Sequence, residues 1–561
     1  MKPIRACLPF VAALSAFAQL TPDQRVSDFL HLAGIYAKNY APYEWKRDTQ
    51  GFDLLNTAPW VERARNARND LDFYEVMVEY VASLNDAHDS YRVPSDFVAR
   101  LNFAVDIYDG KALVDFINRA RLPATEFAFR VGYELVSIDG VPVEDLLKQL
   151  NKYAIAANPR STRRFAANYL TARPQTLMPH AVDVGDAARV VMRRLDGGLE
   201  TYTIPWTKTG LPLLNNGPVP TPGGFAVTRK RTAAAAGDWR ALLRDLQRCE
   251  VGRPQAIIGY GARTPIFGLP DGFEQRLGRA ATDFFYSGTF RSGGLRLGFI
   301  RIPSYIPPSL NAAIGQFIGE VAFLEANTDG LIIDEMHNPG GYVTFVNTIV
   351  QLLMPVKFRT LGFEVRATSG WVLAFSSFVE AAKAEGAELW EIALLEQLKK
   401  EIVDANASNR GRTGPIPLDD LTIDRDPFVD NRGRVFAYTK PIMVLIDELS
   451  ASGGDAFPAT IQDNKRGILF GYRTMGAGGS VAGVDAGPYS EGSTSLTQSL
   501  MNRQNDVITS DYPAAPYVEN IGVRPDIEAD YMTRDNLLQN GKPFVDSFVA
   551  AMIEHIRRSR Q

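Results

Sequence analysis

A serine with small neighbours stands where a buried apolar run meets a predicted helix. Ser452 lies in Ala451-Ser-Gly-Gly-Asp455, shortly after the apolar run Ile442-Met-Val-Leu-Ile-Asp447. The glycines leave its hydroxyl uncovered, and the N–H group of Gly453, at the start of the helix, can donate to an oxyanion. Ser-x-x-Asp is also the spacing of a capping box, so a serine that only caps the helix is the competing interpretation.

A second glycine-rich loop follows another apolar run. The run and its loop read Gly330-Leu-Ile-Ile-Asp-Glu-Met-His-Asn-Pro-Gly-Gly341, and consecutive glycines permit a backbone turn that side chains would block. An N–H group of Gly340 or Gly341 could join Gly453 in a two-donor oxyanion hole. A plain turn between a strand and a helix is the alternative. Two such loops at corresponding ends of two buried strands are the arrangement that acyl transfer requires.

The elements that must position these loops change character along the chain. Apolar residues first recur at helical spacing, then short strands alternate with turns such as Asp139-Gly140, and finally strands alternate with helices. The last pattern predicts a mostly parallel sheet covered on both faces, and a helical stretch at about 371–407. The predicted segments are a signal peptide (1–18), an N-terminal helical domain (19–100), a PDZ-like module (101–205), a β-rich or loop insertion (206–288), an α/β core (289–540) and a C-terminal helix (541–561).

The first residues have the three regions of a signal peptide. Lys2 and Arg5 precede the apolar run from Ala6 to Ala18, which ends in the small-x-small pattern of a cleavage site. A membrane anchor is the alternative, but the run is shorter than the roughly 20 residues that span a bilayer. We therefore expect a secreted or periplasmic protein with no stable membrane insertion after cleavage. Cys249 would remain alone, so no internal disulfide is expected.

Composition and charge exclude other classes of function. A net charge of -4 and the absence of a basic block disfavour nucleic acid as a partner. The glycines at 476–479 are not followed by the Lys-Ser/Thr pair of a phosphate-binding loop. No His, Cys or Asp cluster has metal-ligand spacing, so no metal and no cofactor are expected.

Several of these segments together resemble one known family, the carboxyl-terminal processing (tail-specific) peptidases and their tricorn-type relatives. The resemblance spans most of the chain, with the motifs in the expected order. The matching motifs are Leu84-Asn-Asp-Ala-His88, Gly330 to Gly341, Val444 to Phe457, Gln462-Asp-Asn464, and Glu519-Asn-Ile-Gly-Val-Arg-Pro-Asp-Ile527.

The resemblance implies a fold and a set of catalytic residues. The fold would be a crotonase-like (ClpP-like) α/β core, often with an attached PDZ module, and the nucleophile would be Ser452. The processing branch uses a lysine in a Gly-Lys-Gly turn where this chain has Gly476-Ala-Gly478, and alanine cannot take a proton. The tricorn-type branch uses a histidine supported by a glutamate, and the matching positions are His88 and Glu519. A Ser-His-Glu set is therefore expected rather than a Ser-Lys pair.

Alternatives remain for several of these residues. His88 could be a cation near a helix C-terminus, and Glu519 could lie in a solvated turn. The tricorn type has a serine before its histidine, where this chain has Ala87, so Ser90 or a water would have to tether the base. His337, in the second glycine loop, could also pack, bind substrate or act as the base.

The expected function is hydrolysis of peptide bonds in exported or unfolded polypeptides through a Ser452 acyl-enzyme. The alternative is a noncatalytic peptide- or ligand-binding protein on the same scaffold, which Ala87 and Ala477 favour. Acyl-thioester chemistry on this core would not explain Ser452 together with a signal peptide. The sequence does not determine the natural substrate, recognition of a free carboxyl terminus or the oligomeric state.

Overall fold

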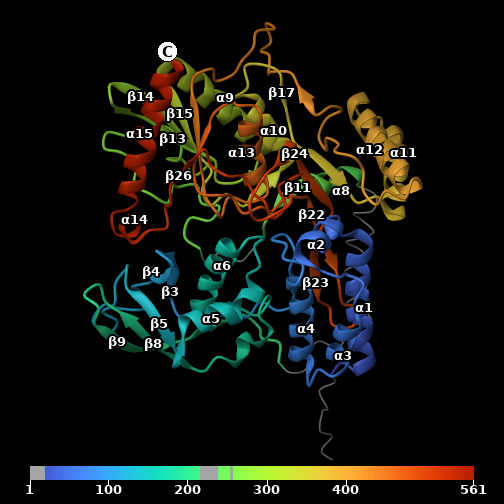
Figure 1. Ribbon diagram of the computed structural model, residues 1–561, viewed down its shortest axis with the longest axis vertical. Helices are drawn as coiled ribbons and strands as arrows, with labels where there is room; N and C mark the ends of the chain where they lie inside the picture. Colours follow the sequence, from blue (N-terminus) through green and yellow to red (C-terminus); the bar gives the residue numbers. More distant parts are fainter. Residues whose placement is uncertain (1–18, 215–237, 253–256) are drawn as a thin grey trace, which may run out of the picture.

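The computed structural model describes residues 19–214, 238–252 and 257–561, and the chain divides into three parts (Figure 1). The N-terminal helices lie at the lower right, a β-rich part lies at the lower left, and a larger α/β part lies above both. The predicted signal peptide and part of the predicted insertion lie outside the described residues.

The N-terminal part is helical, as the periodicity predicts. Thr21 caps the first helix by accepting the backbone N–H of Gln24, and Asn69 caps the fourth through Asp72. Phe29 and Tyr80 belong to the core that these helices share. The helices are α1 (Pro22–Asn39), α2 (Tyr43–Gln50), α3 (Ala58–Arg65) and α4 (Asp70–Ala82).

Two strands from late in the chain run down beside these helices (Figure 1). They are β22 (Val481–Asp485) and β23 (Ser493–Thr497), and β23 pairs with β1 (Tyr91–Arg92). The Tyr36 hydroxyl lies 2.8 Å from Oγ1 of Thr494. The helical part is therefore hydrogen-bonded to a segment more than four hundred residues later.

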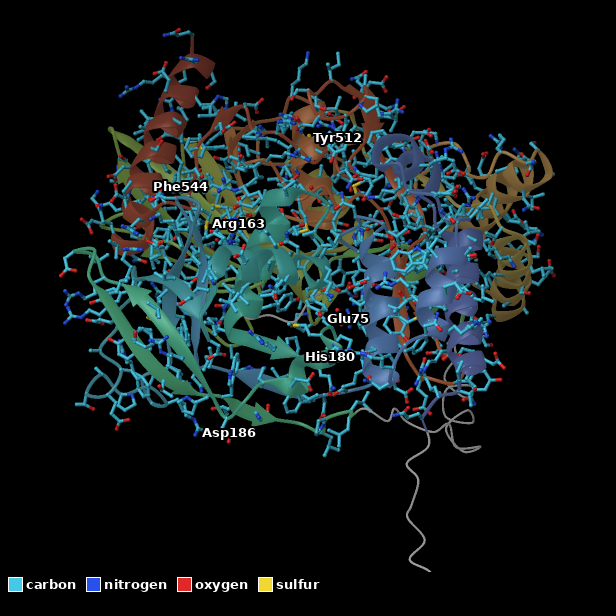
Figure 2. The ribbon with its side chains drawn as sticks, turned by 60° about the horizontal axis from the view of Figure 1, so that its bottom comes forward. Glu75, Arg163, His180, Asp186, Tyr512 and Phe544 are labelled. Carbon is cyan, nitrogen blue, oxygen red and sulfur yellow. The ribbon has the colours of Figure 1, made fainter. Side chains whose placement is uncertain are left out.

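The β-rich part contains an antiparallel sheet in the order β3-β4-β5-β8-β9, with β6 paired to β5. The predicted hairpin is confirmed, because Asp139 and Gly140 both have positive φ, 51° and 82°, between β5 and β6. Glu75 and His180 lie where this part meets α4 (Figure 2), and Glu75 accepts the Tyr153 hydroxyl at 2.6 Å. The elements are β3 (Phe103–Tyr108), β4 (Lys111–Ile117), β5 (Glu134–Ile138), β6 (Val141–Pro142), α5 (Val143–Leu150), α6 (Pro159–Thr171), β8 (Ala187–Arg193) and β9 (Leu199–Pro205), with short 3-10 turns at Asn151–Tyr153 and Pro179–Asp183.

The α/β part is built on a seven-stranded sheet in the order β12-β13-β14-β15-β20-β21-β26. The strands from β14 to β26 are parallel, and β12 and β13 are antiparallel additions at one edge. The predicted mostly parallel sheet is confirmed. The strands are β12 (Glu274–Gln275), β13 (Tyr286–Ser292), β14 (Leu295–Arg301), β15 (Gly330–Asp334), β20 (Ile442–Ile446), β21 (Ile468–Gly471) and β26 (Ile527–Glu528).

Helices cover both faces of this sheet. Ile333 and Val444 share a core with α9 (Leu310–Asn327), α10 (Val343–Gln351) and α13 (Gly453–Asp463). Ile332 and Met443 pack instead with α15 (Lys542–Ser559). Consecutive residues of a strand point to opposite faces, so a strand buried on both faces is apolar throughout, which is why these runs contain no polar alternation.

Two regions differ from the expectation. The stretch at 371–407 is not one helix but two, α11 (Ser369–Glu385) and α12 (Leu389–Ala407), because Gly386 ends the first with φ 68°. The described part of 206–288 includes α8 (Trp239–Leu246), so it is not only strands and loops. The remaining elements are β2 (Val98–Arg100), β7 (Ala172–Pro174), β10 (Thr207–Thr209), β11 (Arg248–Glu250), β16 (Gly340–Tyr342), β17 (Phe358–Arg359), β18 (Gly362–Val365), β19 (Asp424–Arg425), β24 (Ser499–Val507), β25 (Ala515–Tyr517) and α14 (Arg534–Leu538). Within the described ranges, we find no helix with the length and apolar character needed to cross a membrane.

Candidate active site

Ser452 lies in a strained turn between β20 and α13. Its φ of 59° and ψ of -106° fall in a region that residues other than glycine rarely adopt. The Asp455 carboxylate holds the turn by accepting the Ser452 N–H at 2.6 Å. The capping-box spacing therefore contributes to the turn, and it does not exclude a catalytic role for the hydroxyl.

The Ser452 hydroxyl lies against the imidazole of His88. The distance from Ser452 Oγ to His88 Nε2 is 2.7 Å, and both residues are buried. His88 does not end a helix, because it lies in the turn that follows α4. Its backbone is fixed at both ends: Asp86 Oδ1 accepts the His88 N–H at 2.9 Å, and Ser495 Oγ donates to the His88 carbonyl at 2.6 Å. Asp86 and Ser495 thus hold the backbone of His88, and the Ser90 N–H donates to Ser495 Oγ at 3.0 Å.

Two carboxylates stand beside this imidazole. Asp86 Oδ1 lies 3.8 Å from His88 Nδ1, and ligand atoms of Asp86, His88 and Glu519 all lie within 4.8 Å of one another. Glu519 is fully buried, which excludes the solvated-turn interpretation. Its Oε2 accepts the Gly478 N–H at 2.9 Å, and its Oε1 accepts the ammonium of Lys46.

Burial controls the ionisation of these acids. Burial and then the Asp86 charge raise the pKa of Glu519, Lys46 opposes both effects, and the resulting pKa is about 7. Burial and the charges of Asp86 and Glu519 also raise the pKa of Asp89 well above its ordinary value. The ammonium of Lys46 therefore favours the charged form of Glu519 near neutral pH.

The two predicted glycine loops do meet. A Cβ atom placed on Gly340 would lie 2.6 Å from the Gly453 nitrogen, and one placed on Gly453 would lie 2.9 Å from the Gly341 nitrogen. The Gly340 N–H already donates to Asn338 Oδ1 at 2.9 Å. That bond engages the Gly340 N–H, and the pairing of Cys249 with Gly341 between β11 and β16 engages the Gly341 N–H, so Gly453 is the remaining candidate donor.

His337 lies in a different environment from His88. Its Nε2 is 2.9 Å from Arg164 Nη2 and 3.1 Å from Asp447 Oδ2. Burial and the Arg164 charge lower the pKa of His337 well below its ordinary value. Among the described histidines, His88 is the one that contacts Ser452 Oγ.

The turn that would carry a lysine in the processing branch is closed by Asp455. This carboxylate accepts the N–H groups of Gly476 and Ala477, each at 3.0 Å, and the hydroxyl of Thr474 as well as the Ser452 N–H. The side chain of Ala477 is fully buried. Asp455 thus fixes the nucleophile turn and the 474–477 turn together.

Replacing Asp455 with asparagine is expected to lower the free energy of unfolding by about 2–4 kcal/mol. An amide NH2 group would replace one of the two acceptor oxygens and face backbone N–H groups. Denaturant unfolding at pH 7 measures the change. Asp485→Asn, at an exposed position of β22, is the matched control and should change stability by less than about 0.5 kcal/mol. Equal stability of the two variants would contradict this role for Asp455.

Asp86, His88 and Glu519 are also the one set of side chains, in the part of the chain that the structure describes, close enough to hold a metal ion. The Lys46 ammonium already binds the Glu519 carboxylate. The chain itself thus supplies a cation to the Glu519 carboxylate.

An open cleft of about 260 Å³ leads to His88. Residues of β11 and of β22 line it. In the described topology each of these strands is at the edge of its sheet, β11 beside β16 and β22 beside β23. Both charge signs line the cleft, from Arg92 and Arg248 to Glu250 and Asp485.

Sequence patterns missed three residues of this site. Asp86 had a local signal, since an aspartate two residues before a backbone N–H can accept it in an Asx turn. Ser495 and Lys46 had none, because they reach the site from other elements, β23 and α2.

Comparison with known proteins agrees with this architecture. Residues 296–529 match the model of peptidase family S41, and residues 98–211 match that of a PDZ domain. A protein of Chlamydia pneumoniae is 25% identical over 593 residues, which cover 94% of this chain and 90% of that protein. A protein of Chlamydia trachomatis serovar D is 25% identical over 611 residues, 96% of this chain and 94% of its own length.

Solved structures show the same fold. The structure of mature CPAF complexed with lactacystin matches with a TM-score of 0.74 at 22% identity, over 96% of this chain and 99% of CPAF. A second structure of mature CPAF gives a TM-score of 0.75 at the same identity, over 96% of this chain and 98% of that one. The expected crotonase-like core and PDZ module are confirmed. Over residues 296–529 the chain is therefore similar to peptidase family S41.

Proposed function

We propose that this chain is a serine endopeptidase in which Ser452 is the nucleophile and His88 its base. The contact of 2.7 Å between Ser452 Oγ and His88 Nε2 carries the proposal. A general base must lie within hydrogen-bond distance of the proton it removes. Position 477, where the processing branch has its lysine, is a buried alanine in this chain.

The reaction follows from this geometry. As Ser452 Oγ attacks the peptide carbonyl, His88 Nε2 takes the hydroxyl proton, and the N–H group of Gly453 stabilises the oxyanion. His88 returns the proton to the leaving amine, which frees the new amino terminus. A water then gives its proton to His88 and attacks the acyl carbonyl, and His88 passes that proton to the departing Ser452 Oγ, which restores the resting enzyme.

The carboxylates support the charged imidazole. When the serine hydroxyl donates to Nε2, the proton of neutral His88 is on Nδ1, toward Asp86 and Glu519. We assign the orienting acid to Glu519, as the family resemblance implies, with Asp86 as a second carboxylate that also fixes the His88 backbone. Removing a proton from Ser452 then creates a cation between two acids.

The cleft favours an extended polypeptide as substrate. A peptide strand lying along β11 or β22 would meet the edge of a sheet, so its main chain could hydrogen-bond without a defined sequence. Folded proteins offer few such strands, because most of their extended segments are already paired in sheets. We infer that unfolded segments are cleaved, and the leader-like residues 1–18 favour exported proteins as their source.

The test is hydrolysis of an unfolded protein, such as reduced and alkylated α-lactalbumin, by the purified wild type and by Ser452→Ala. The wild type should release new amino termini, the native and disulfide-bonded substrate should be cleaved at least about tenfold more slowly, and Ser452→Ala should lose about 10⁶-fold in kcat. Tight binding of the unfolded protein without cleavage would support a noncatalytic binding protein instead.

A further inference from the structure

We propose that Lys46, from helix α2 of the N-terminal part, is a positioning residue of the active site. It would hold the Glu519 carboxylate beside His88 and join the turn that carries His88 to the turn that carries Glu519. This inference rests on the proposed function of Ser452 and His88. No motif of the peptidase core contains Lys46.

All three N–H donors of Lys46 are used inside the site. Its Nζ donates to Glu519 Oε1, to the carbonyl of Asn85 at 2.8 Å and to Asn520 Oδ1 at 2.7 Å. The side chains of Lys46 and Glu519 are both fully buried. Asn85 begins the turn that leads to His88, and Asn520 follows Glu519, so one ammonium binds both turns at their bases.

Asn520 closes the same junction from the other side. Its amide nitrogen donates to the carbonyls of Asn85 and Ala157, at 3.1 and 2.9 Å. Its φ of 62° and the φ of 50° at Asn85 lie in the left-handed region. Asparagine adopts this region more readily than most residues, and Lys46 supplies a contact to each of the two turns.

The charges around Glu519 require a cation. Asp86, Asp89 and His88 face it from the 85–89 turn, Tyr40 faces it from the end of α1, and Arg473 approaches through the carbonyl of Asn520. In the described part of the chain, Lys46 is the cationic side chain that forms an ion pair with the Glu519 carboxylate. Without it, burial and the charge of Asp86 would favour the protonated acid, which cannot stabilise an imidazolium.

Other side chains already dock α2 on the core. Glu44 binds Arg366 at 2.7 Å and also binds Arg412. The ring of Trp45 packs on Tyr517 at 5.3 Å and on Tyr512, which is labelled in Figure 2, at 5.9 Å. Anchoring of the helix is thus separable from the contact of Lys46 with Glu519, and Glu44→Gln is a matched control.

The first experiment compares the pH dependence of kcat/KM on one peptide for the wild type, Lys46→Met and Glu44→Gln. Lys46→Met should lose about 10²-fold in kcat at pH 7, with KM changed less than about twofold, because Glu519 is no longer held charged and in place. The acid limb of its profile should move up by about one pH unit. Glu44→Gln should keep the wild-type profile.

The double variant Lys46→Met/Glu519→Gln separates positioning from folding. It removes the Glu519 charge together with the Lys46 charge that opposes it, so it should fold even where Lys46→Met alone does not. If Lys46 acts through Glu519, the double variant is no slower than Glu519→Gln. The inference is overturned if the fold-loss in kcat of the double variant equals the product of the two single-variant losses. It is also overturned if Lys46→Met keeps the wild-type rate and pH profile.

Labelling of Ser452 by a fluorophosphonate distinguishes failure of the proposed role of Lys46 from failure of the proposed function. A labelled wild type with an unaffected Lys46→Met variant overturns only the role of Lys46. An unlabelled wild type overturns the proposed function and this inference with it.

Discussion

Replacing His88 with alanine is expected to lower kcat for peptide hydrolysis by about 10⁴- to 10⁶-fold, while KM changes little. The imidazole is the group within 2.7 Å of the Ser452 hydroxyl, and a neutral serine without a base is a poor nucleophile. Steady-state kinetics on one fluorogenic peptide measure the loss. The effect should lie in kcat, because His88 acts on the reacting proton rather than on the ground-state substrate.

His31→Ala is the matched control for His88, since His31 is an exposed histidine on α1. It should keep wild-type kinetics. His337→Gln gives a second comparison, because His337 pairs with Arg164 and Asp447. A His88→Ala variant within tenfold of the wild type, together with a large loss in His337→Gln, would move the base to His337.

Gly340→Ala is expected to lower kcat/KM by about 10²- to 10³-fold, the loss typical of a damaged oxyanion hole. The new Cβ atom would lie 2.3 Å from the carbonyl oxygen of Cys249 and 2.6 Å from the nitrogen of Gly453. Both are backbone atoms, so no side chain can move aside. The φ of 96° at Gly340 is also unfavourable for alanine.

Gly483→Ala is the control for Gly340→Ala. Gly483 belongs to β22 and lines the same cleft, yet a Cβ atom there would meet nothing within 4 Å. It should leave kcat/KM within about twofold of the wild type. Wild-type kcat/KM in a folded Gly340→Ala variant would show that the close contact of the two glycine loops does not matter for the reaction.

Local pattern predicted the core of the fold because its strands are short, apolar and buried on both faces. Ile332 and Ile333 pack on opposite helical layers, and such a run has no other stable place than the middle of a covered sheet. The pairing of β23 with β1 could not be predicted in this way. It joins segments about four hundred residues apart, and no local rule specifies a partner at that distance.

The residues of the site also differ in whether local sequence could predict them. Ser452 and the glycine loops lie at strand ends in the core, where small residues indicate a close backbone approach and could be predicted. His88 and Glu519 came from the family resemblance alone, and a turn sequence does not reveal that Glu519 is fully buried. Lys46 had no signal because its role depends on how helix α2 docks on the core.

The central claim is that Ser452 is a nucleophile activated by His88, and mass spectrometry after reaction with a fluorophosphonate tests it most directly. We predict one adduct per wild-type chain, on the peptide containing Ser452, with no adduct in Ser452→Ala and labelling at least about 10³-fold slower in His88→Ala. An unmodified Ser452 in folded wild-type protein, or equal labelling rates in His88→Ala and the wild type, would contradict the claim.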